Sequence, residues 1–394
     1  MTKIIFLAIA LNCFTSDILL SEIKYKNYKN YTETKTQFNL EKITENVLQY
    51  PWGMSFVDNE NLLITEKNGR LVKVNVSSGK IKEIKHNIQS IKYKGKNISY
   101  GQGGLLDVLN HENYVYFSYS HDHGNKTYGK SNQNLSTAIA RGILSENEIK
   151  NLEILLISES KININKHFGS RIVIKDNHLF AGFGDRGKGM IAQDSSKHPG
   201  SIIRIKIDGT LPEDNPSFKE HPSWLPELYL IGIRNSQGIT ISPHDKEIYF
   251  TQHGPMGGDN IGRVKYASNF GWKEIAWGGK EYSGFKIGNK PFKDKYEKPI
   301  FVWVPSIGIG NLKFYKGEEF PEWEGDLLIS ATKANMLFRL DYENDSVVKE
   351  EFIIKNNVNI KRIRDFEIDR SGNIYLISDD KNSALWKISS KKEN

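Results

Sequence analysis

The sequence predicts an all-β fold, a six-bladed β-propeller, and three observations carry this prediction. Short apolar strands separated by turn signals run along the whole chain, and helical periodicity is hard to find. A loose four-strand unit recurs six times at intervals of about 50 to 75 residues, the length that a propeller blade needs. No Pro-, Gly- or Ser-rich linker divides the chain, which disfavours the main competitor, a pair of β-sandwiches.

Each predicted unit starts with a motif of small or polar residues, followed by an apolar strand, a polar turn and a second strand. Leu62–Thr65 and Arg70–Val74 form one such hairpin around an Asn-Gly turn, the strongest short hairpin signal. Innermost propeller strands start at one end of the channel, so all six motifs are expected to face one site. The motifs are Trp52-Gly53, Gly103-Gly104, Gly169-Ser170, Gln237-Gly238, Gly310-Asn311 and Arg364-Asp365.

Three regions are predicted along the chain. Residues 1–21 are predicted to be a secretory signal peptide, because Lys3 precedes the apolar run Ile4–Leu11 and small residues follow. Residues 22–46 are predicted to be a loose polar leader, and residues 47–391 the propeller. The apolar run is too short to span a bilayer, and no later segment is apolar enough to form a transmembrane helix.

Cysteine and charge content suggest the compartment and the partners. The single cysteine, Cys13, lies in the predicted signal, so cleavage downstream leaves no disulfide. An exported, cysteine-free, large domain indicates a bacterial periplasmic or secreted protein, and a lipid anchor at Cys13 is the minority alternative. The net charge is +7, but the lysines are scattered and no nucleic-acid motif is present, so nucleic acid is not an expected partner.

A histidine and an aspartate flank the hairpin of the third unit. His167 begins the string HFGSR at 167–171, and Asp185 lies in GFGDRG at 182–187. Folding of this hairpin brings the two residues to one rim of the β-structure. An imidazole beside a carboxylate is the minimum set for a general base, because the carboxylate fixes the tautomer and stabilises the imidazolium.

Cationic and amide side chains gather near the other predicted motifs. Converging cations are unstable together unless an anion compensates them, so the set indicates a ligand with several carboxylates or phosphates. The side chains are Gln102, Arg234, Asn235, Lys333, Arg362 and Arg364.

Two further features allow two interpretations each. The string HGPMGGD at 253–259 is either a plain loop or a turn whose exposed carbonyls suit a hard cation such as Ca²⁺. Trp303 is either a core tryptophan or an aromatic platform for a sugar ring at the channel mouth.

These strings resemble the soluble PQQ-dependent glucose and aldose sugar dehydrogenases, the glucose/sorbosone dehydrogenase family, over residues 47–390. They occur in the family's order and at similar spacing. The matching strings are PWGMSF at 51–56, GQGGLLDV at 101–108, HFGSR at 167–171, GFGDRG at 182–187, GIRNSQG at 232–238, HGPMGGD at 253–259, NFGW at 269–272 and RIRD at 362–365.

The resemblance implies a propeller that binds pyrroloquinoline quinone (PQQ), a tricarboxylate, and Ca²⁺. It implies that His167 is the general base, Asp185 its orienting partner and Arg234 the group beside the reacting quinone carbonyl. It also implies oxidation of an aldose sugar at C1 to a lactone, with hydride transfer to the quinone and electrons passed to an external acceptor, a periplasmic cytochrome or quinone. The remaining implied roles are cofactor contacts for Gln102, Asn235, Lys333, Arg362 and Arg364, Ca²⁺ ligation by the carbonyls of Gly254 and Pro255, and a substrate-side position for Trp303.

The sequence departs from the family pattern at two places. Ile233 and Ser236 replace the usual His and Pro of GHRNPQG, but Arg234 remains between them, so only a local change is expected. Asn260 stands where the family commonly has Glu, which weakens the case for a second, structural Ca²⁺.

Two alternatives come from other functional classes. A Ca²⁺-dependent propeller lactonase or hydrolase has no use for the cations Lys333, Arg362 and Arg364. A non-catalytic carbohydrate-binding propeller does not need His167 together with Asp185. The sequence therefore favours the dehydrogenase.

Overall fold

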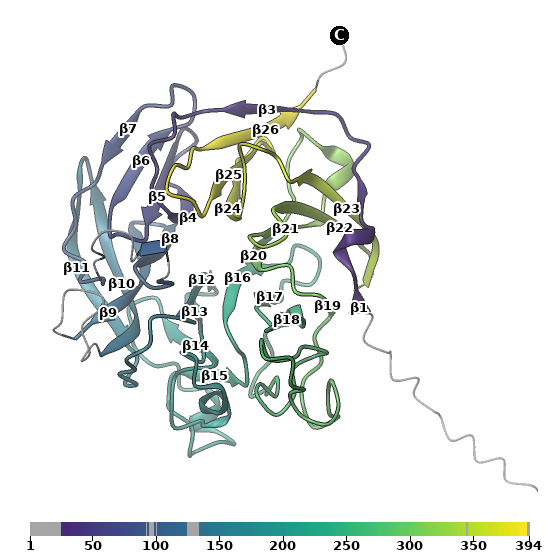
Figure 1. The fold of residues 1–394 in the computed structure, drawn as a ribbon. Helices are drawn as coiled ribbons and strands as arrows, with labels where there is room; N and C mark the ends of the chain where they lie inside the picture. Colours follow the sequence, from purple (N-terminus) through teal and green to yellow (C-terminus); the bar gives the residue numbers. More distant parts are fainter. Residues whose placement is uncertain are drawn as a thin grey trace, which may run out of the picture.

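The computed structural model confirms the predicted propeller. It describes residues 25–91, 93, 98–99, 101–123, 134–343 and 346–391. In this part of the chain the strands form six sheets, arranged as blades around a central channel (Figure 1). The predicted signal peptide 1–21, with Cys13, lies outside the described residues.

The first three blades each consist of four consecutive strands, with the first strand nearest the channel (Figure 1). Blade 1 contains β4 (Pro51–Phe56), β5 (Asn61–Glu66), β6 (Leu71–Asn75) and β7 (Ile81–Glu83). Blade 2 contains β8 (Leu105–His111), β9 (Tyr114–Asp122), β10 (Leu135–Ser145) and β11 (Glu148–Ile157). Blade 3 contains β12 (Gly169–Lys175), β13 (His178–Phe183), β14 (Ser201–Lys206) and β15 (Leu228–Ile231).

Each of the last three blades also takes a strand from the N-terminal segment. Blade 4 contains β16 (Ser236–Ile241), β17 (Ile248–Gln252), β18 (Asp259–Arg263), β19 (Phe301–Trp303) and β1 (Tyr25–Lys26). Blade 5 contains β20 (Ile309–Phe314), β21 (Leu327–Ala331), β22 (Met336–Glu343), β23 (Ser346–Lys355) and β2 (Thr32–Glu33). Blade 6 contains β24 (Ile363–Ile368), β25 (Ile374–Ser378), β26 (Trp386–Ser390) and β3 (Phe38–Lys42). Short 3₁₀ helices are η1 (Tyr28–Asn30), η3 (Gly189–Gln193), η4 (Pro216–Phe218) and η5 (Pro321–Trp323).

The segment predicted as a loose leader, residues 22–46, needs correction where it is described. β1 and β2 pair in parallel with β19 and β23, and β3 pairs antiparallel with β26, so that Leu40 is opposite Ile388. The N-terminal strand β3 therefore closes the ring by completing the C-terminal blade. Sequence reasoning missed these strands because they are short edge strands, and only β3 has an alternating apolar pair, Phe38 and Leu40.

Every innermost strand is irregular where it begins. In blade 3, Gly169 pairs with Phe183 but Ile172 pairs with Ala181, so one extra residue forms a bulge. A bulge re-aims the side chains beside it, here at the channel end where the predicted motifs lie. The six register shifts fall at 51–54, 105–108, 169–172, 236–238, 309–312 and 363–365.

Arg171 of blade 3 is buried and contacts four other blades. Its Nη1 is 2.7 Å from Asp107 Oδ1 in blade 2 and 2.9 Å from Asp365 Oδ2 in blade 6. Its Nε donates to the Gln237 carbonyl in blade 4, and its guanidinium lies over the Trp52 ring in blade 1. Because breaking a buried ion pair of this kind is strongly destabilising, these contacts fix how the blades meet.

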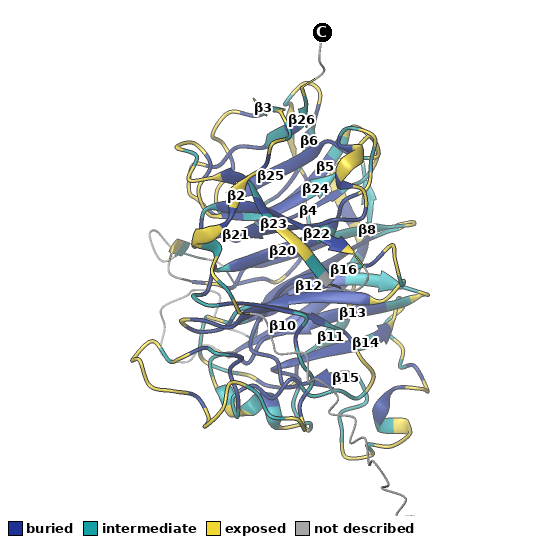
Figure 2. Ribbon diagram, turned by 90° about the vertical axis from the view of Figure 1, so that its right-hand side faces the viewer, coloured by how far each residue is buried: buried dark blue, intermediate teal, exposed yellow. Residues whose placement is uncertain are grey.

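Neighbouring blades pack their buried faces together, and the exposed residues lie mostly in the loops (Figure 2). Phe180 of blade 3 and Phe250 of blade 4 belong to one such cluster, for example. Within the described ranges, no helix has the length and apolar character to cross a membrane.

Candidate active site

His167 and Asp185 are brought together at the ends of the hairpin formed by β12 and β13. Its turn residues, Asp176 and Asn177, have the positive φ values, 49° and 58°, that a type I′ turn needs. His167 Nδ1 lies 2.6 Å from Asp185 Oδ1. An ionised carboxylate only accepts hydrogen bonds, so Nδ1 carries the proton and Nε2 keeps its lone pair.

The backbone of His167 is held in a left-handed conformation, with φ of 52°. Its N–H donates to Gln102 Oε1 over 2.8 Å, and its carbonyl accepts from the Arg186 N–H over 3.2 Å. Gly184 passes so close that a Cβ there would lie 2.2 Å from the His167 carbonyl oxygen. Backbone strain of this kind persists only where surrounding contacts fix it, and it gathers at functional sites.

Asp185 has donors on both carboxylate oxygens. The Gly187 N–H donates to Oδ1 over 2.8 Å, and the Trp272 indole N–H donates to Oδ2 over 2.7 Å. Burial opposes ionisation, but the hydrogen bond from His167 and the charge of Arg234 hold the pKa of Asp185 below its usual value. The carboxylate is therefore charged at neutral pH.

His167 is neutral at the same pH. Its side chain is 12% exposed. Burial lowers the pKa of His167 below its usual value, and the charge of Arg234 lowers it further. The hydrogen bond to Asp185 raises the pKa but does not outweigh these effects. A neutral imidazole with a free Nε2 is the form that accepts a proton.

Arg234 approaches this pair from the segment before β16. Its guanidinium lies over the Trp272 ring, 5.4 Å from the centroid, and its Nη1 donates to the His253 carbonyl over 3.3 Å. Its own carbonyl accepts from the Asp185 N–H over 2.8 Å. The three predicted catalytic residues are thus adjacent.

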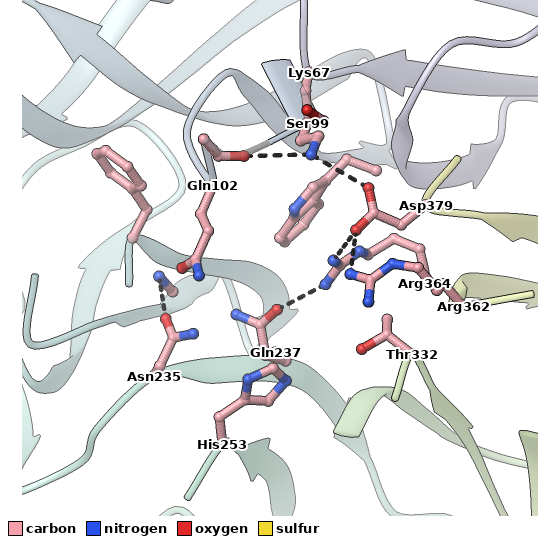
Figure 3. Close-up of a pocket in the computed structure, with 14 residues that line it drawn as sticks. Lys67, Ser99, Gln102, Asn235, Gln237, His253, Thr332, Arg362, Arg364 and Asp379 are labelled. Carbon is pink, nitrogen blue, oxygen red and sulfur yellow. Dashed lines mark hydrogen bonds and ion pairs between the residues drawn. The ribbon is translucent and has the colours of Figure 1, made fainter. Parts of the chain in front are cut away.

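A polar cavity of about 170 Å³ opens beside them (Figure 3). His167, Arg234 and Lys333 are outside its lining, but each precedes or follows a lining residue in sequence. The side chain of Lys333 is exposed and forms no ion pair with the described residues. The lining residues are Trp52, Lys67, Ser99, Gly101, Gln102, Phe168, Gly169, Asn235, Gln237, His253, Thr332, Arg362, Arg364 and Asp379.

Asp379 lies between three cations in this cavity (Figure 3). Its Oδ2 is 2.9 Å from Arg362 Nη2 and 2.6 Å from Arg364 Nη2, and its Oδ1 is 3.3 Å from Lys67 Nζ. Burial opposes ionisation, but these cations hold the pKa of Asp379 far below its usual value. The predicted cations Arg362 and Arg364 are thus partly compensated within the protein. With Lys67, three positive charges surround one carboxylate, so about two remain for a ligand.

One donor in the cavity has no partner among the described residues. Arg364 Nε is buried and unpaired, although its Nη1 donates to Gln237 Oε1 over 3.1 Å. A buried unsatisfied donor is costly, which favours a ligand that brings an acceptor.

The turn predicted to bind a metal is fixed by Asp259. Asp259 Oδ1 accepts from the Gly254 N–H over 2.8 Å, and Oδ2 accepts from Gly308 and Ile309. The carbonyls of Gly254 and Pro255 accept no hydrogen bond from described residues. Across those same residues, no group of three or more His, Cys, Asp or Glu side chains could hold a metal ion. A hard cation here would therefore depend on carbonyl oxygens and on ligand oxygens.

Trp303 does not lie at the channel mouth, so it does not have the substrate-side position that the family resemblance implies. It is fully buried in β19, an outer strand of blade 4, and its indole N–H donates to Tyr31 Oη over 2.8 Å. It packs edge-on against Phe301. Trp303 is therefore a core residue that holds the N-terminal segment, which is the alternative left open by the sequence.

Comparison with known proteins bears on the whole propeller. The model of the glucose / sorbosone dehydrogenase family matches residues 48–387. The chain belongs to this family.

Relatives and a solved structure agree with the family. Aldose sugar dehydrogenase YliI of Escherichia coli (strain K12) is 29% identical over 359 residues, covering 88% of this chain and 92% of the relative. Quinoprotein glucose dehydrogenase B of Acinetobacter calcoaceticus is 23% identical over 408 residues, covering 83% and 82%. The crystal structure of the soluble aldose sugar dehydrogenase of Escherichia coli in its apo-form has a TM-score of 0.81 at 28% identity, covering 90% of this chain and 100% of that one.

In this glucose/sorbosone dehydrogenase, sequence reasoning missed Lys67, His253 and Asp379. Each directly follows the second strand of its blade, β5, β17 or β25. In an antiparallel pair the second strand ends where the first begins, so these residues reach the same channel end as the motifs. The residue that directly follows the second strand of each predicted blade was therefore a candidate that the sequence could have supplied. Trp272 was quoted within NFGW, but only the fold brings it to Asp185.

Proposed function

We propose that this protein is a PQQ-dependent sugar dehydrogenase that oxidises aldoses at C1 to lactones. The observation that carries the proposal is the neutral His167, bonded to Asp185, at the edge of a cation-lined pocket. The family supports a sugar as substrate. The word quinoprotein in the name of the Acinetobacter calcoaceticus relative supports a quinone cofactor.

His167 is the proposed proton acceptor. Because its Nδ1 donates to Asp185, Nε2 is the atom that takes the C1 hydroxyl proton, while the C1 hydrogen leaves as hydride. When bound, PQQ supplies the hydride acceptor. Asp185 stabilises the imidazolium, and Trp272 keeps this carboxylate oriented.

The pocket residues suit a tricarboxylate. Arg362 and Arg364 in the lining, and Lys333 next to it in sequence, offer cationic donors, and Arg364 Nε lacks a partner among the described residues. Gln102 Oε1 and Asn235 Oδ1 already accept main-chain N–H groups, so both residues offer their amide NH₂ groups to a ligand. Such donors match the acceptors of PQQ carboxylates and carbonyls.

Positive charge near the reacting groups has two proposed sources. Arg234, held over the Trp272 ring, would stabilise negative charge that develops in the pocket. The carbonyls of Gly254 and Pro255, which accept no hydrogen bond from described residues, would hold Ca²⁺.

The cellular setting is proposed from the sequence. Residues 1–21 would direct export to the periplasm or outside the cell, with a lipid anchor at Cys13 as the minority alternative. Electrons would then pass to an external acceptor, a periplasmic cytochrome or quinone.

Reconstitution of the apoprotein tests the proposal. The protein is loaded with PQQ and Ca²⁺, aldoses are added, and reduction of an artificial electron-acceptor dye is followed. We expect PQQ-dependent turnover, and we expect His167→Ala to keep PQQ and lose about 10²- to 10⁴-fold in kcat. His111→Ala, at the far end of β8, is the matched control and should behave as the wild type.

Each other outcome has a defined meaning. If the apoprotein binds no PQQ, the proposal is wrong. PQQ binding without turnover of any aldose or related alcohol favours a binding module, and lactone hydrolysis without dye reduction favours the hydrolase.

A further inference from the structure

Lys67 is a buried lysine whose ammonium group contacts two main-chain carbonyls and one carboxylate. The residue is 4% exposed and follows β5 in blade 1. Its Nζ lies 3.3 Å from Asp379 Oδ1, 3.3 Å from the Gly101 carbonyl and 3.4 Å from the Ile98 carbonyl. The two carbonyls accept hydrogen bonds from Nζ, and the contact with Asp379 is an ion pair. Although Lys67 lines the pocket, its charge acts on the protein rather than on a ligand.

The main chain of Lys67 also contacts the segment it holds. A Cβ on Gly104 would lie 2.1 Å from the Lys67 carbonyl oxygen, so the two backbones are in close contact. On the other side, a Cβ on Gly101 would lie 2.4 Å from the Tyr93 ring and 2.5 Å from Asn165 Nδ2. The backbone at Gly101 and Gly104 is thus confined between Lys67 and the side chains of Tyr93 and Asn165.

The enclosed segment carries the contact that sets the base. Gln102 lies within it, and Gln102 Oε1 accepts the His167 N–H over 2.8 Å. This bond is one of the contacts that hold the left-handed backbone of His167. A continuous set of contacts therefore runs from Asp379 through Lys67 and the Gly101 carbonyl to Gln102 and His167. Figure 3 shows its first part, from Asp379 to Lys67.

We propose that Lys67 is a positioning residue that couples the arginine side of the pocket to the base, by holding the carbonyls of Ile98 and Gly101 so that Gln102 can orient His167. The inference rests on the proposed function and deepens it. Among the described residues, Lys67 forms no hydrogen bond or ion pair with His167, Asp185 or Arg234, and its ammonium group is directed at Asp379 and the carbonyls of Ile98 and Gly101. Its loss should therefore impair proton abstraction more than cofactor binding.

The expected effects of Lys67→Met separate these roles. Arg362 and Arg364 stay paired with Asp379, so the Kd for PQQ should change little. The kcat should fall about ten- to a hundredfold, because a displaced base no longer meets the C1 hydroxyl in reacting geometry. The His167 imidazole, freed to meet more water, should titrate at higher pH, even though Asp185, Arg234 and Lys166 still face it.

The experiment compares Lys67→Met, Lys67→Arg and the control Lys82→Met, an exposed lysine on β7 in the same blade. PQQ binding, kcat and KM are measured on reconstituted protein. The His167 imidazole is titrated by NMR in the apoprotein, a readout that needs neither PQQ nor turnover. If Lys67→Met does not fold, Lys67→Gln, which keeps two donors without the charge, takes its place.

We expect the kcat loss and the NMR shift in Lys67→Met, partial recovery of both in Lys67→Arg, and neither in Lys82→Met. Weaker PQQ binding with unchanged kcat would make Lys67 a cofactor ligand and overturn the proposal. An unchanged His167 titration would also overturn it. If wild-type protein binds no PQQ, the proposed function is wrong, yet the NMR comparison still tests the coupling of Lys67 to His167.

Discussion

The Trp272 indole N–H donates to Asp185 Oδ2 over 2.7 Å, while Oδ1 of the same carboxylate is bonded to His167. Trp272 lies between β18 and β19 of blade 4, whereas the His–Asp pair belongs to blade 3. The orientation of the base is therefore set by two blades. Without Trp272, Asp185 Oδ2 would have no donor, and the carboxylate group could rotate away from the imidazole.

Trp272→Phe should lower kcat about tenfold or more, because it leaves Asp185 Oδ2 buried without its donor, at a cost of about 1–3 kcal/mol. Steady-state kinetics and chemical unfolding measure the two effects. Trp277→Phe is a matched control, since Trp277 is fully buried, stacks on Trp272 and has an indole N–H without a partner among the described residues. Equal losses in both variants would contradict a role for the hydrogen bond.

Asp185→Asn should lower kcat about 10²- to 10⁴-fold, because the carboxylate no longer fixes the tautomer or stabilises the imidazolium. The pH dependence of kcat/KM tests the same pairing independently, through the direction in which its acid limb moves. The wild-type kcat/KM should fall as His167 becomes protonated, at a pH below the usual histidine range, since burial lowers its pKa. The hydrogen bond to Asp185 opposes that shift, so Asp185→Asn should move the acid limb to still lower pH. A limb that moves upward would exclude this pairing.

Asp379→Asn should destabilise the apoprotein by about 3–5 kcal/mol, because Lys67, Arg362 and Arg364 lose the buried carboxylate that compensates them. Bound PQQ should restore part of the loss by supplying carboxylates. Urea unfolding with and without PQQ measures both effects. The neighbouring Asp380→Asn is the control, because Asp380 is exposed. A variant that PQQ does not rescue would argue against an anionic ligand in this pocket.

The fold was predictable because each blade repeats a short local pattern. The six motifs lie at or next to the bulges of the innermost strands, so small residues at strand starts were a sufficient signal. The His167–Asp185 contact followed from the hairpin between them, which is also local. Strands β1 and β2 were not predictable from apolar alternation, since they are two-residue edge strands, and β3 offers only one alternating pair, Phe38 and Leu40.

The rest of the site depends on contacts between blades. Asp379 and Lys67 are more than 300 residues apart, and no local pattern relates them. Trp303 was open to two interpretations because its burial depends on how far its strand lies from the channel within the blade. Its partner Tyr31 lies in the segment predicted to be a leader, so no sequence pattern pairs the two residues.

His198 supplies a prediction about stability and pH. It joins blade 3 to blade 2, with Nδ1 bonded to Glu159 and Nε2 3.3 Å from Glu227 Oε2. Burial opposes protonation, but these two carboxylates raise the pKa of His198 above its usual value. Burial of Glu159 alone would raise the pKa of its carboxyl. The hydrogen bond from His198 outweighs this effect and lowers the pKa of Glu159 to about 2.

The signs of these shifts define a pH window. The stabilisation from a raised histidine pKa is complete below the unfolded value, about 6.5, and is lost as pH rises through the folded pKa of His198. The stabilisation from the lowered pKa of Glu159 is complete above the unfolded value, about 4.5, and is lost as pH falls towards about 2. His198→Gln should therefore cost most stability, about 1–3 kcal/mol, between roughly pH 5 and 6, and less at pH 9. Urea unfolding across this range measures the cost, with His111→Gln as control, and a cost that grows towards alkaline pH would contradict the assigned shift.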